Sequence, residues 1–471
     1  MSGILEKLYY KMPVWLQNLA VSAYGYIWYK RRLQGKFKSV LAECKKRELY
    51  TSEQWESYNN QQLRNILLHS FRNVPYYRNL YIKLGFSEEN LANFTVNDLY
   101  RLPILEKNTY RVFGQTEMMS QKFNTDGAFF PSSGSTGTPT QTWYSKSMHQ
   151  TYFAMFEARV NHWAGLDYKV PRGTFGPRRI VIDPHSEGPF YRYNFVERQT
   201  YFSAFHLSAK NIANYLEGLI KHKAEYMTGY CMSNYIMARF IEESGLKAPK
   251  LKAVLTSSEK LTEEMRETFR RVYGCETFDS YNGVEACNLV SECEHHRLHI
   301  VPDVGYTEII NQEGHPCKPG ETGQVIATGF INYDQPLIRY RMGDLLTLSK
   351  HQNCPCGRQM PVVEEIVGRI MDTVITRDGR EMVSFYRVFS NNTSIIESQV
   401  IQHTLDDFEI NLVIHKPLPV EEKEAILEKL RSQLGDEANI NIHFLKEIPR
   451  GPNGKFKSVI SYIKRDEINK T

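Results

Sequence analysis

The sequence lacks the two most widespread phosphate-binding patterns. Neither G-x-x-x-x-G-K-[ST] nor a G-x-G-x-x-G between a strand and a helix occurs in its 471 residues, which excludes a P-loop and a dinucleotide-binding fingerprint. No apolar run is long and uninterrupted enough to cross a bilayer. No basic block alternates with aromatic residues, and the net charge of +5 is small for this length. We therefore expect no nucleic-acid partner.

A signal-peptide pattern, internal repeats and low-complexity linkers are also missing. Eight cysteines in such a long chain favour a reducing compartment, where thiols stay reduced, buried or metal-bound. We therefore expect a cytoplasmic protein. The length exceeds one ordinary domain and predicts two or three units.

Hydrophobic periodicity predicts a layered α/β protein of several domains. Apolar residues recur at helical spacing up to Val74-Pro75, where a first helical segment ends. From about residue 100 to 360, short β-branched stretches such as 253–256 alternate with amphipathic stretches such as 209–221, as in a layered α/β body. Strand and turn patterns over 305–325 indicate a β subdomain. We expect a helical segment (1–75), a large α/β domain (76–367) and a small α+β C-terminal domain (368–471).

The first 50 residues are basic and aromatic. They hold ten Lys and Arg against three Asp and Glu, and the apolar, aromatic stretch from Met12 to Tyr29 precedes Lys30-Arg31-Arg32. One interpretation is an amphipathic helix that rests peripherally on an anionic membrane. The other, which we favour, is a helical layer packed on the main domain, because aromatic stripes at helical spacing usually belong to a core. A homodimer also stays open.

The most informative stretch is the run SSGSTGTP at 132–139. Its glycines let the backbone approach an anion closely, its hydroxyls are hydrogen-bond donors, and its proline restricts the exit of the loop. The run predicts a polyphosphate site formed by Ser132, Ser133, Gly134, Ser135, Thr136, Gly137 and Thr138.

Further motifs follow this loop. They are TSSEKL at 256–261, DSYNGVE at 279–285, IRYRMGD at 338–344, GRIMD at 368–372 and IPRGPNGK at 448–455. In this order they resemble the adenylate-forming superfamily of acyl-CoA synthetases, luciferases and peptide-synthetase adenylation domains. The stretch QPLIRYR at 335–341, the cysteine pairs and the aromatic N-terminal segment are similar to the phenylacetate-CoA ligase-like branch, which includes relatives from capsular polysaccharide clusters.

The resemblance implies an AMP-forming ligase. Such an enzyme activates a small-molecule carboxylic acid with ATP and Mg²⁺, releases pyrophosphate, and passes the acyl group to an acceptor, of which CoA is the leading one. Glu285 would bind Mg²⁺. Tyr281, between Ser280 and Asn282, would stack on adenine, and Asp344 would accept hydrogen bonds from the ribose hydroxyls.

The C-terminal motifs complete this assignment. Arg369 would reach the ribose or the α-phosphate, and Lys455 would lie beside the attacking carboxylate, so Lys455, Glu285 and Arg369 are the expected catalytic residues. Asp372 would mark the hinge about which a small, mobile C-terminal domain rotates between half-reactions.

One position departs from the family pattern. Thr138 stands where a lysine is common, which removes a cation from the phosphate loop.

Two alternative functions follow from the resemblance. The first is an adenylating ligase of capsular polysaccharide or secondary metabolism that transfers the acyl group to an amine, a sugar or a carrier protein. The second is a scaffold that has lost catalysis.

Cysteine and histidine spacing indicates a zinc site. Cys354-Pro355-Cys356, and Cys293 with His299 six positions on, offer three thiolates and an imidazole, a ligand set of structural zinc centres. Their spacing also resembles that of the ligase-like branch. Four ligands would close the shell and make the metal structural. The competitors for the fourth position are Cys287, His295, His296 and Cys317.

The pocket for the acid is the part of the site that the motifs define least. His206 and the stretch that includes Gly229 and Tyr230 fall where the family usually lines its acyl pocket. A histidine between apolar residues is, however, typical of a hydrogen-bonded core position.

Overall fold

The computed structural model of the chain describes residues 8–463, with gaps at 133–138, 177–179, 182, 184–185, 312, 368–373, 383–384, 390–391, 393, 415, 447 and 449–457. Several of the expected site residues lie outside the described residues. They are Ser133, Gly134, Ser135, Thr136, Gly137, Thr138, Arg369, Asp372 and Lys455.

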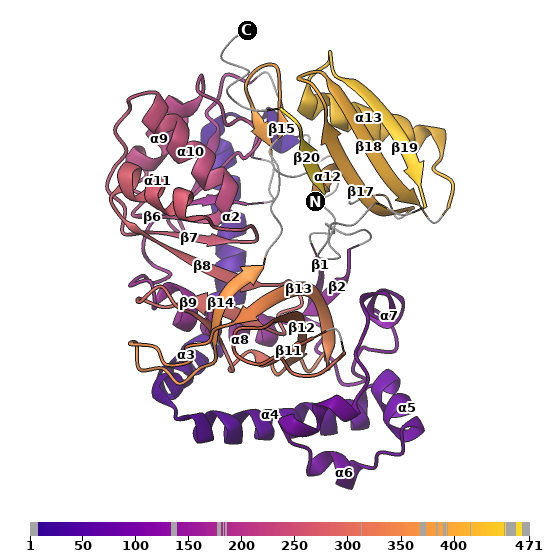
Figure 1. The fold of residues 1–471 in the computed structure, drawn as a ribbon. Coiled ribbons are helices and arrows are strands. Elements are labelled where there is room, and N and C mark those ends of the chain that lie inside the picture. The colour runs from indigo at the N-terminus through magenta and orange to yellow at the C-terminus, as the bar shows by residue number, and fades with distance from the viewer. Residues whose placement is uncertain are drawn as a thin grey trace.

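One large sheet of twelve strands runs through the body (Figure 1). Its order is β11-β12-β13-β14-β10-β9-β8-β7-β6-β3-β5-β4. The β8-β7-β6-β3-β5 half is parallel, with β4 antiparallel at the edge, and the half from β11 to β9 is antiparallel. The strands are β3 (Arg172–Phe175), β4 (Tyr191–Asn194), β5 (Gln199–Phe202), β6 (Tyr226–Tyr230), β7 (Ala253–Ser257), β8 (Glu276–Asn282), β9 (Leu289–Glu292), β10 (Leu298–Ile300), β11 (Gly305–Ile310), β12 (Thr322–Gly329), β13 (Tyr340–Leu348) and β14 (Val362–Val367). The predicted α/β class is confirmed.

Alternation along the parallel strands directs side chains into two cores. Met227 and Val254 pack with helices α9 (Ile212–Lys221), α10 (Cys231–Glu243) and α11 (Glu263–Tyr273) on one face. Tyr226 and Leu255 point to the other face and pack with α8 (Lys146–Phe156). This period of two is what a sheet covered by helices on both faces requires.

The N-terminal helices pack against the antiparallel half. Helix α4 (Ser52–Asn73) begins at a capping box of Thr51 and Gln54. Its Leu63 and Leu67 join the core that contains Val325 of β12. The remaining elements of this region are α3 (Phe37–Lys46), η1 (Arg47–Leu49), α5 (Pro75–Lys83), α6 (Glu88–Ala92), η2 (Val96–Arg101), α7 (Lys107–Phe113) and, after α8, the π-helical turn η3 (Glu157–Asn161).

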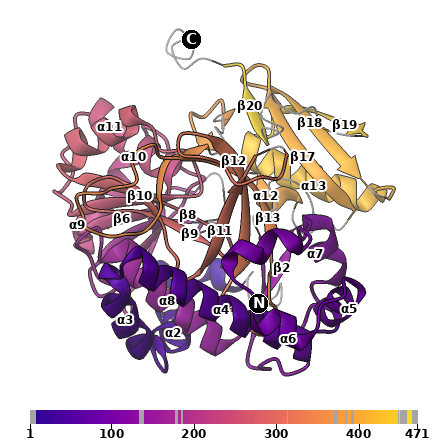
Figure 2. The ribbon, with the colours of Figure 1, turned by 60° about the horizontal axis from the view of Figure 1, so that its bottom comes forward.

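Helix α2 (Val14–Leu33) lies against β4 and α8; Figure 2 labels it next to α8. It is therefore a helical layer on the body, but of its aromatic residues Trp15, Tyr24 and Tyr26 are exposed, whereas the half-buried Trp28 packs against Phe130 and His149. The buried residues of α2 are Gln17, Ser22 and Gly25, whereas Trp15 and Ile27 are exposed. In the part of the chain that the structure describes, no helix is long and apolar enough to cross a membrane.

The C-terminal residues form a separate sheet of order β19-β18-β17-β20, drawn in yellow in Figure 1. Leu412 of β18 and Leu430 of α13 belong to its core, against which the partly buried Phe205 of the body packs. The elements of this region are β15 (Val374–Ile375), β16 (Glu381–Met382), α12 (Tyr386–Phe389), β17 (Ile395–Gln402), β18 (Asp407–Ile414), α13 (Val420–Leu434), β19 (Asn439–Leu445) and β20 (Val459–Ser461).

The end of β6 requires a glycine, and this requirement can be tested. Gly229 has a φ of +109°, and a Cβ at this position would overlap the carbonyl oxygen of Phe175 on the neighbouring strand. We expect Gly229→Ala to lower the free energy of unfolding by more than about 3 kcal/mol, measured by denaturant unfolding. The control is Gly85→Ala, which has φ +78° but no atom within 4 Å, and should cost about 1 kcal/mol. Equal losses would show that backbone strain alone makes Gly229 necessary.

Candidate functional site

The site lies where the parallel half of the sheet meets the antiparallel half. Strand β8 runs parallel to β7 and antiparallel to β9. Tyr281 and Asn282 end β8, and Glu285 follows in the turn that leads to β9. Ligands of open α/β sheets bind outside the carboxyl ends of strands at such changes of direction. The DSYNGVE motif therefore occupies a favourable position for binding.

The expected phosphate loop connects the two strands of a hairpin, β1 (Ala128–Pro131) and β2 (Gln141–Tyr144), which pair with Pro131 opposite Gln141. Ser132 and Thr140 close the hairpin where the loop begins and ends. The Ser132 amide donates to the Thr140 carbonyl (2.9 Å), and the Thr140 amide donates to the Ser132 hydroxyl (3.0 Å). Ser132 thus holds together the two ends of the loop through its hydrogen bonds with Thr140.

Gln335 anchors this hairpin to the body. Its side-chain oxygen accepts hydrogen bonds from the Trp143 amide (2.7 Å) and the Tyr110 hydroxyl (3.0 Å), and its side-chain nitrogen donates to the Gly114 carbonyl (2.7 Å). Sequence analysis used Gln335 only to identify the branch, through the QPLIRYR stretch. Its role in orienting the loop depends on contacts that no local pattern predicts.

Glu285 is brought to the base of the same loop. Its carboxylate is buried, with 7% of the residue exposed, and accepts hydrogen bonds from the hydroxyls of Thr140 (3.0 Å) and Tyr340 (3.2 Å). The two hydroxyls therefore hold the negative charge of Glu285 next to Thr140, where the β1–β2 loop ends. Thr140 and Tyr340 were missed in the sequence, although each lies beside or within a recognised motif.

A second pair forms from two other expected residues. The Tyr281 hydroxyl donates to the Asp344 carboxylate (3.0 Å). Burial and the nearby Asp344 charge raise the pKa of Tyr281, which keeps the phenol protonated as a donor. Asp344 follows Gly343, whose φ is +82°. Ser280 is buried and donates from its hydroxyl to the Thr256 carbonyl (3.3 Å), while Asn282 is half-buried at the end of β8.

Glu259, in the TSSEKL motif, ties β7 to the start of α10. Its carboxylate accepts the Met232 amide (2.7 Å) in the first turn of that helix, where donors lack partners within the helix. Burial raises the pKa of Glu259 to about 7. The carboxylate therefore binds the turn that follows Gly229 and Tyr230.

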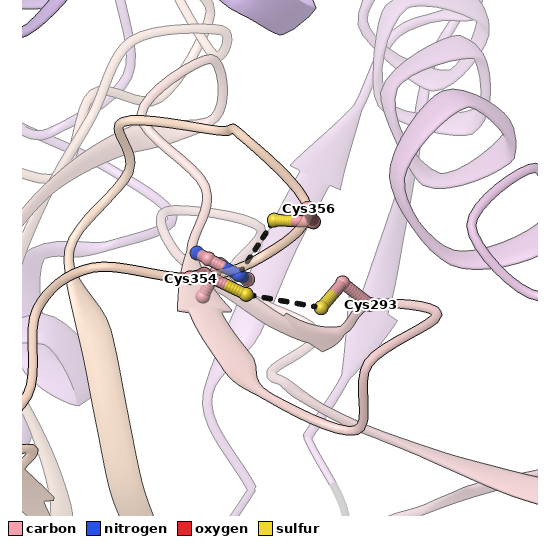
Figure 3. A group of neighbouring side chains, drawn as sticks. Cys293, Cys354 and Cys356 are labelled. Carbon is pink, nitrogen blue, oxygen red and sulfur yellow. Dashed lines mark hydrogen bonds between the residues drawn. The ribbon is translucent and has the colours of Figure 1, made fainter.

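Four side chains converge at the expected zinc site (Figure 3). The ligand atoms of Cys293, His299, Cys354 and Cys356 all lie within 4.8 Å of one another. The Cys293 and Cys354 sulfurs are 3.7 Å apart, close to the roughly 3.8 Å between thiolates on a tetrahedral zinc. Burial lowers the pKa of His299 to about 4, which keeps its imidazole neutral and able to bind a metal. The donor set and its geometry fit a closed zinc centre.

Neighbouring groups orient these ligands. His299 Nδ1 lies 3.3 Å from the Met360 carbonyl. The other ring nitrogen, Nε2, therefore faces the cluster, 3.5 Å from the Cys356 sulfur. The four competitors lie outside this group. Cys287 contacts Met342 and His296 contacts Glu292, while His295 is exposed and Cys317 is buried.

A cavity of about 380 Å³ lies beside the ends of β3 and β6. Thr228, Gly176 and Tyr226 form one wall, and Phe153 and Phe156 of α8 form another. Four charged side chains also line it: Arg32 and Arg172, which both pair with Glu197, and Glu157. Its chemistry is therefore aromatic on one side and polar, without excess charge, on the other.

Comparison with known proteins finds several similar chains. Residues 374–462 match the family described as the CapK C-terminal domain. Protein CapK of Staphylococcus aureus is 25% identical over 98% of this chain and 100% of its own length. The phenylacetate-coenzyme A ligase of Thermus thermophilus is 22% identical over 88% of this chain and 98% of its own length. The chain is therefore similar, over nearly its full length, to the adenylate-forming superfamily, and within it to the branch of phenylacetate-CoA ligases and their capsular relatives.

Solved structures show the same fold. The 2-hydroxyisobutyryl-CoA ligase in complex with 2-HIB-AMP and CoA, in the thioesterification state, superposes with a TM-score of 0.55 at 18% identity, over 88% of this chain and 91% of that one. The same ligase in the postadenylation state gives a TM-score of 0.54 at 16% identity, over 90% and 92%. The adenylate-forming fold thus extends over most of the chain.

The pocket residues expected from the superfamily have different surroundings. His206 is buried, 2.8 Å from the Ser203 hydroxyl and 2.9 Å from the Asp183 carbonyl, and stacks on Phe190. This is the environment of a hydrogen-bonded core histidine, and His206 does not line the cavity. Gly229 and Tyr230 follow Thr228, which does line it.

The zinc centre yields a direct prediction. We expect about one zinc per chain by elemental analysis, and we expect Cys293→Ala to lose this metal and lower the melting temperature, because four ligands stabilise the folded state. The control is Cys275→Ala, which removes a buried thiol outside the cluster and should keep the zinc. A wild-type protein without stoichiometric zinc would remove the site.

Glu259 predicts a pH dependence of stability. In the folded protein the pKa of Glu259 is about 7, whereas its usual pKa is 4.5. Between these two pH values the folded state therefore binds more protons than the unfolded state. Stability contributed by this group is therefore complete below about pH 4.5 and is lost as pH rises toward 7. Glu259→Gln keeps an acceptor for the Met232 amide. It should reduce the loss of unfolding free energy between pH 5 and pH 8 by about 1 to 3 kcal/mol. Denaturant unfolding of both proteins at pH 5 and pH 8 measures this loss. An equal loss in the wild type and the variant would contradict the role of Glu259.

Proposed function

We propose that this protein is an ATP- and Mg²⁺-dependent, AMP-forming ligase that activates a carboxylic acid and passes its acyl group to CoA. The observation that carries the proposal is the buried Glu285 carboxylate, held by Thr140 and Tyr340 at the base of the serine-rich loop. Similarity to phenylacetate-coenzyme A ligases supports the reaction type.

The proposed reaction has two steps. A carboxylate oxygen of the acid attacks the α-phosphorus of ATP, the bond from that phosphorus to the bridging oxygen breaks, and pyrophosphate leaves. The thiol of CoA then attacks the acyl carbon of the adenylate, loses its proton, and displaces AMP. Both steps need charge stabilisation and alignment more than proton transfer.

The described residues support distinct roles in the first step. Ser132 and Thr140 would hold the base of the loop while its amides and hydroxyls bind phosphate. Glu285 would contribute a carboxylate oxygen to Mg²⁺, which neutralises phosphate charge when bound. Asp344, oriented by Tyr281, would accept the ribose hydroxyls. Arg339 and Arg341 are not needed, because Arg339 pairs with Glu308 and Arg341 with Glu106.

The C-terminal part would supply the remaining groups. Lys455 would stabilise the attacking carboxylate and the α-phosphate, and Arg369 would contact the ribose or the α-phosphate. Rotation about Asp372 would withdraw Lys455 and admit the acceptor. Domain limits of 1–75, 76–367 and 368–471 fit this division of labour.

The cavity at β3 and β6 is proposed to hold the rest of the acid. Its volume of about 380 Å³ suits a small acid. Its balanced charges, Arg32 and Arg172 against Glu157 and Glu197, favour a substrate with neutral or zwitterionic polar groups. A long aliphatic chain would leave those side chains without water.

A second candidate differs only in the acceptor. Protein CapK is similar over the full length of the chain, and the C-terminal region matches the CapK C-terminal domain. We therefore keep an amine, a sugar or a carrier protein as an alternative acceptor in capsular polysaccharide or secondary metabolism.

Pyrophosphate release from ATP and Mg²⁺ tests the proposal. The acids are aryl, arylacetic, fatty, amino and uronic, each with and without CoA. We expect release with small polar acids and faster turnover with CoA. Acid-dependent adenylate formation that CoA does not accelerate would favour the alternative acceptor. No release with any acid, from folded protein, would contradict the ligase.

Glu285 provides a sharper test of the site. Glu285→Gln should lower pyrophosphate release by about a hundredfold or more, because a neutral amide binds Mg²⁺ poorly. The control, Glu276→Gln, changes an exposed carboxylate paired with Arg270 and should keep wild-type rates. An equal effect of both substitutions would contradict a specific role for Glu285.

Lys455 separates the two half-reactions. Lys455→Ala should abolish adenylate formation but leave transfer from a supplied acyl-adenylate to CoA nearly unchanged, because the lysine would act only in the first step. Single-turnover assays with chemically made adenylate measure this. Equal loss in both steps would contradict rotation of the C-terminal domain between two working positions.

A further inference from the structure

Helix α2 presents several of its large apolar side chains to the outside of the molecule, while Trp28 packs inward against Phe130 and His149. Trp15, Leu19, Tyr26 and Ile27 are 62%, 48%, 49% and 64% exposed. Trp15, Leu19 and Tyr26 follow one another at spacings of four and seven residues, which places them on one line along the helix. A surface helix normally has the reverse orientation.

The fully buried residues of α2 are polar or glycine instead: Gln17, Ser22 and Gly25. The side-chain oxygen of Gln17 accepts a hydrogen bond from Arg192 (2.6 Å), and Asn18 accepts the Tyr193 amide (2.9 Å). Ser22 accepts the Phe195 amide (3.1 Å). These bonds fix the helix with its uncharged polar residues inward, so the exposure of its aromatic residues is a built feature of the fold.

Charge along this segment is of one sign. No Asp or Glu occurs between residues 8 and 42, and the helix from Val14 to Tyr29 has no charged residue. The lysines at its two ends, Lys11 on one side and Lys30, Lys36 and Lys38 on the other, are exposed. An aromatic, uncharged strip with cationic ends matches the interfacial layer of a membrane with anionic headgroups.

The dimensions argue against a second copy of the chain as the occupant. The uncharged part of α2 is roughly 24 Å long and 10 Å wide, or roughly 240 Å². A stable protein interface buries about 800 Å² on each partner. The segment also carries no acidic residue that could pair with the lysines of another copy.

We propose that the outward face of α2 is a membrane-docking surface that rests on an anionic lipid bilayer without crossing it. Trp15 and Tyr26 lie among headgroups, Leu19 and Ile27 reach the acyl boundary, and the lysines contact phosphate. Arg32 and Leu33, in the last turn of α2, line the 380 Å³ cavity. Docking therefore fixes the orientation of this cavity relative to the lipid surface. The proposal does not depend on the ligase reaction.

Co-sedimentation of the full-length protein with vesicles tests this surface. The vesicles contain phosphatidylcholine alone or phosphatidylcholine with phosphatidylglycerol. We expect binding to the anionic vesicles and at least about tenfold weaker binding to the neutral ones. The triple variant Trp15→Ser, Leu19→Ser, Ile27→Ser should bind the anionic vesicles at least about tenfold more weakly than the wild type.

A matched variant controls for general loss of surface hydrophobicity. Tyr100→Ser, Leu84→Ser and Ile82→Ser change an aromatic residue, a leucine and an isoleucine that are also exposed, but lie away from α2. This variant should bind vesicles as the wild type does. Thermal unfolding verifies that both triple variants remain folded.

Two results would overturn the proposal. One is equal vesicle binding by the wild type and the α2 variant. The other is no vesicle binding by the wild type. In that second case, a wild-type dimer, seen by light scattering, that the α2 variant converts to a monomer would assign the face to contact between copies of the chain.

Discussion

The buried carboxylate of Glu285 is the constraint on which the proposed site depends. A charge in this position is costly unless it is hydrogen-bonded, and its two bonds come from Thr140 after the loop and Tyr340 at the start of β13. One side chain therefore connects the turn after β8 with two segments that are distant in the chain. This contact sets Thr140, at the base of the proposed phosphate loop, and β13, which carries Asp344, relative to Glu285, the proposed Mg²⁺ ligand.

The wider architecture supports this arrangement through a second polar centre. Gln335 binds the hairpin, α7 and the following loop through both ends of its amide. Buried amides that satisfy several partners specify a single arrangement, because any shift leaves a polar group without a bond. The expected zinc ligands form a further polar cluster along the sheet, where Cys293 and His299 flank the β9–β10 turn and Cys354 and Cys356 approach them. Polar contacts and the Cys/His cluster thus hold the antiparallel half together next to the hairpin that carries the proposed phosphate loop.

The sequence predicted the functional motifs better than their surroundings. The order of the motifs was sufficient for the superfamily, because loops that bind phosphate and metal require particular residue types. Cys354-Pro355-Cys356 and the Cys293 to His299 spacing also identified a ligand group that the fold brings together. His206 was less informative, because a histidine between apolar residues gives the same sequence pattern in a core as in a pocket. Its bonds to Ser203 and Asp183 depend on the packing of β5 and the preceding loop.

The amino-acid sequence by itself determined the α/β class, the motif order and the cysteine and histidine ligand set, since these depend on local residue chemistry and short spacings. Only the tertiary structure decided that Thr140 and Tyr340 bind Glu285 and that Tyr281 binds Asp344. It also decided that α2 turns Gln17 and Ser22 inward and Trp15 outward. The periodicity of a helix reveals its two faces but not which one meets the protein, because that choice depends on the hydrogen-bonding groups of β4 and the segment after it. Those groups are about 170 residues away in the chain.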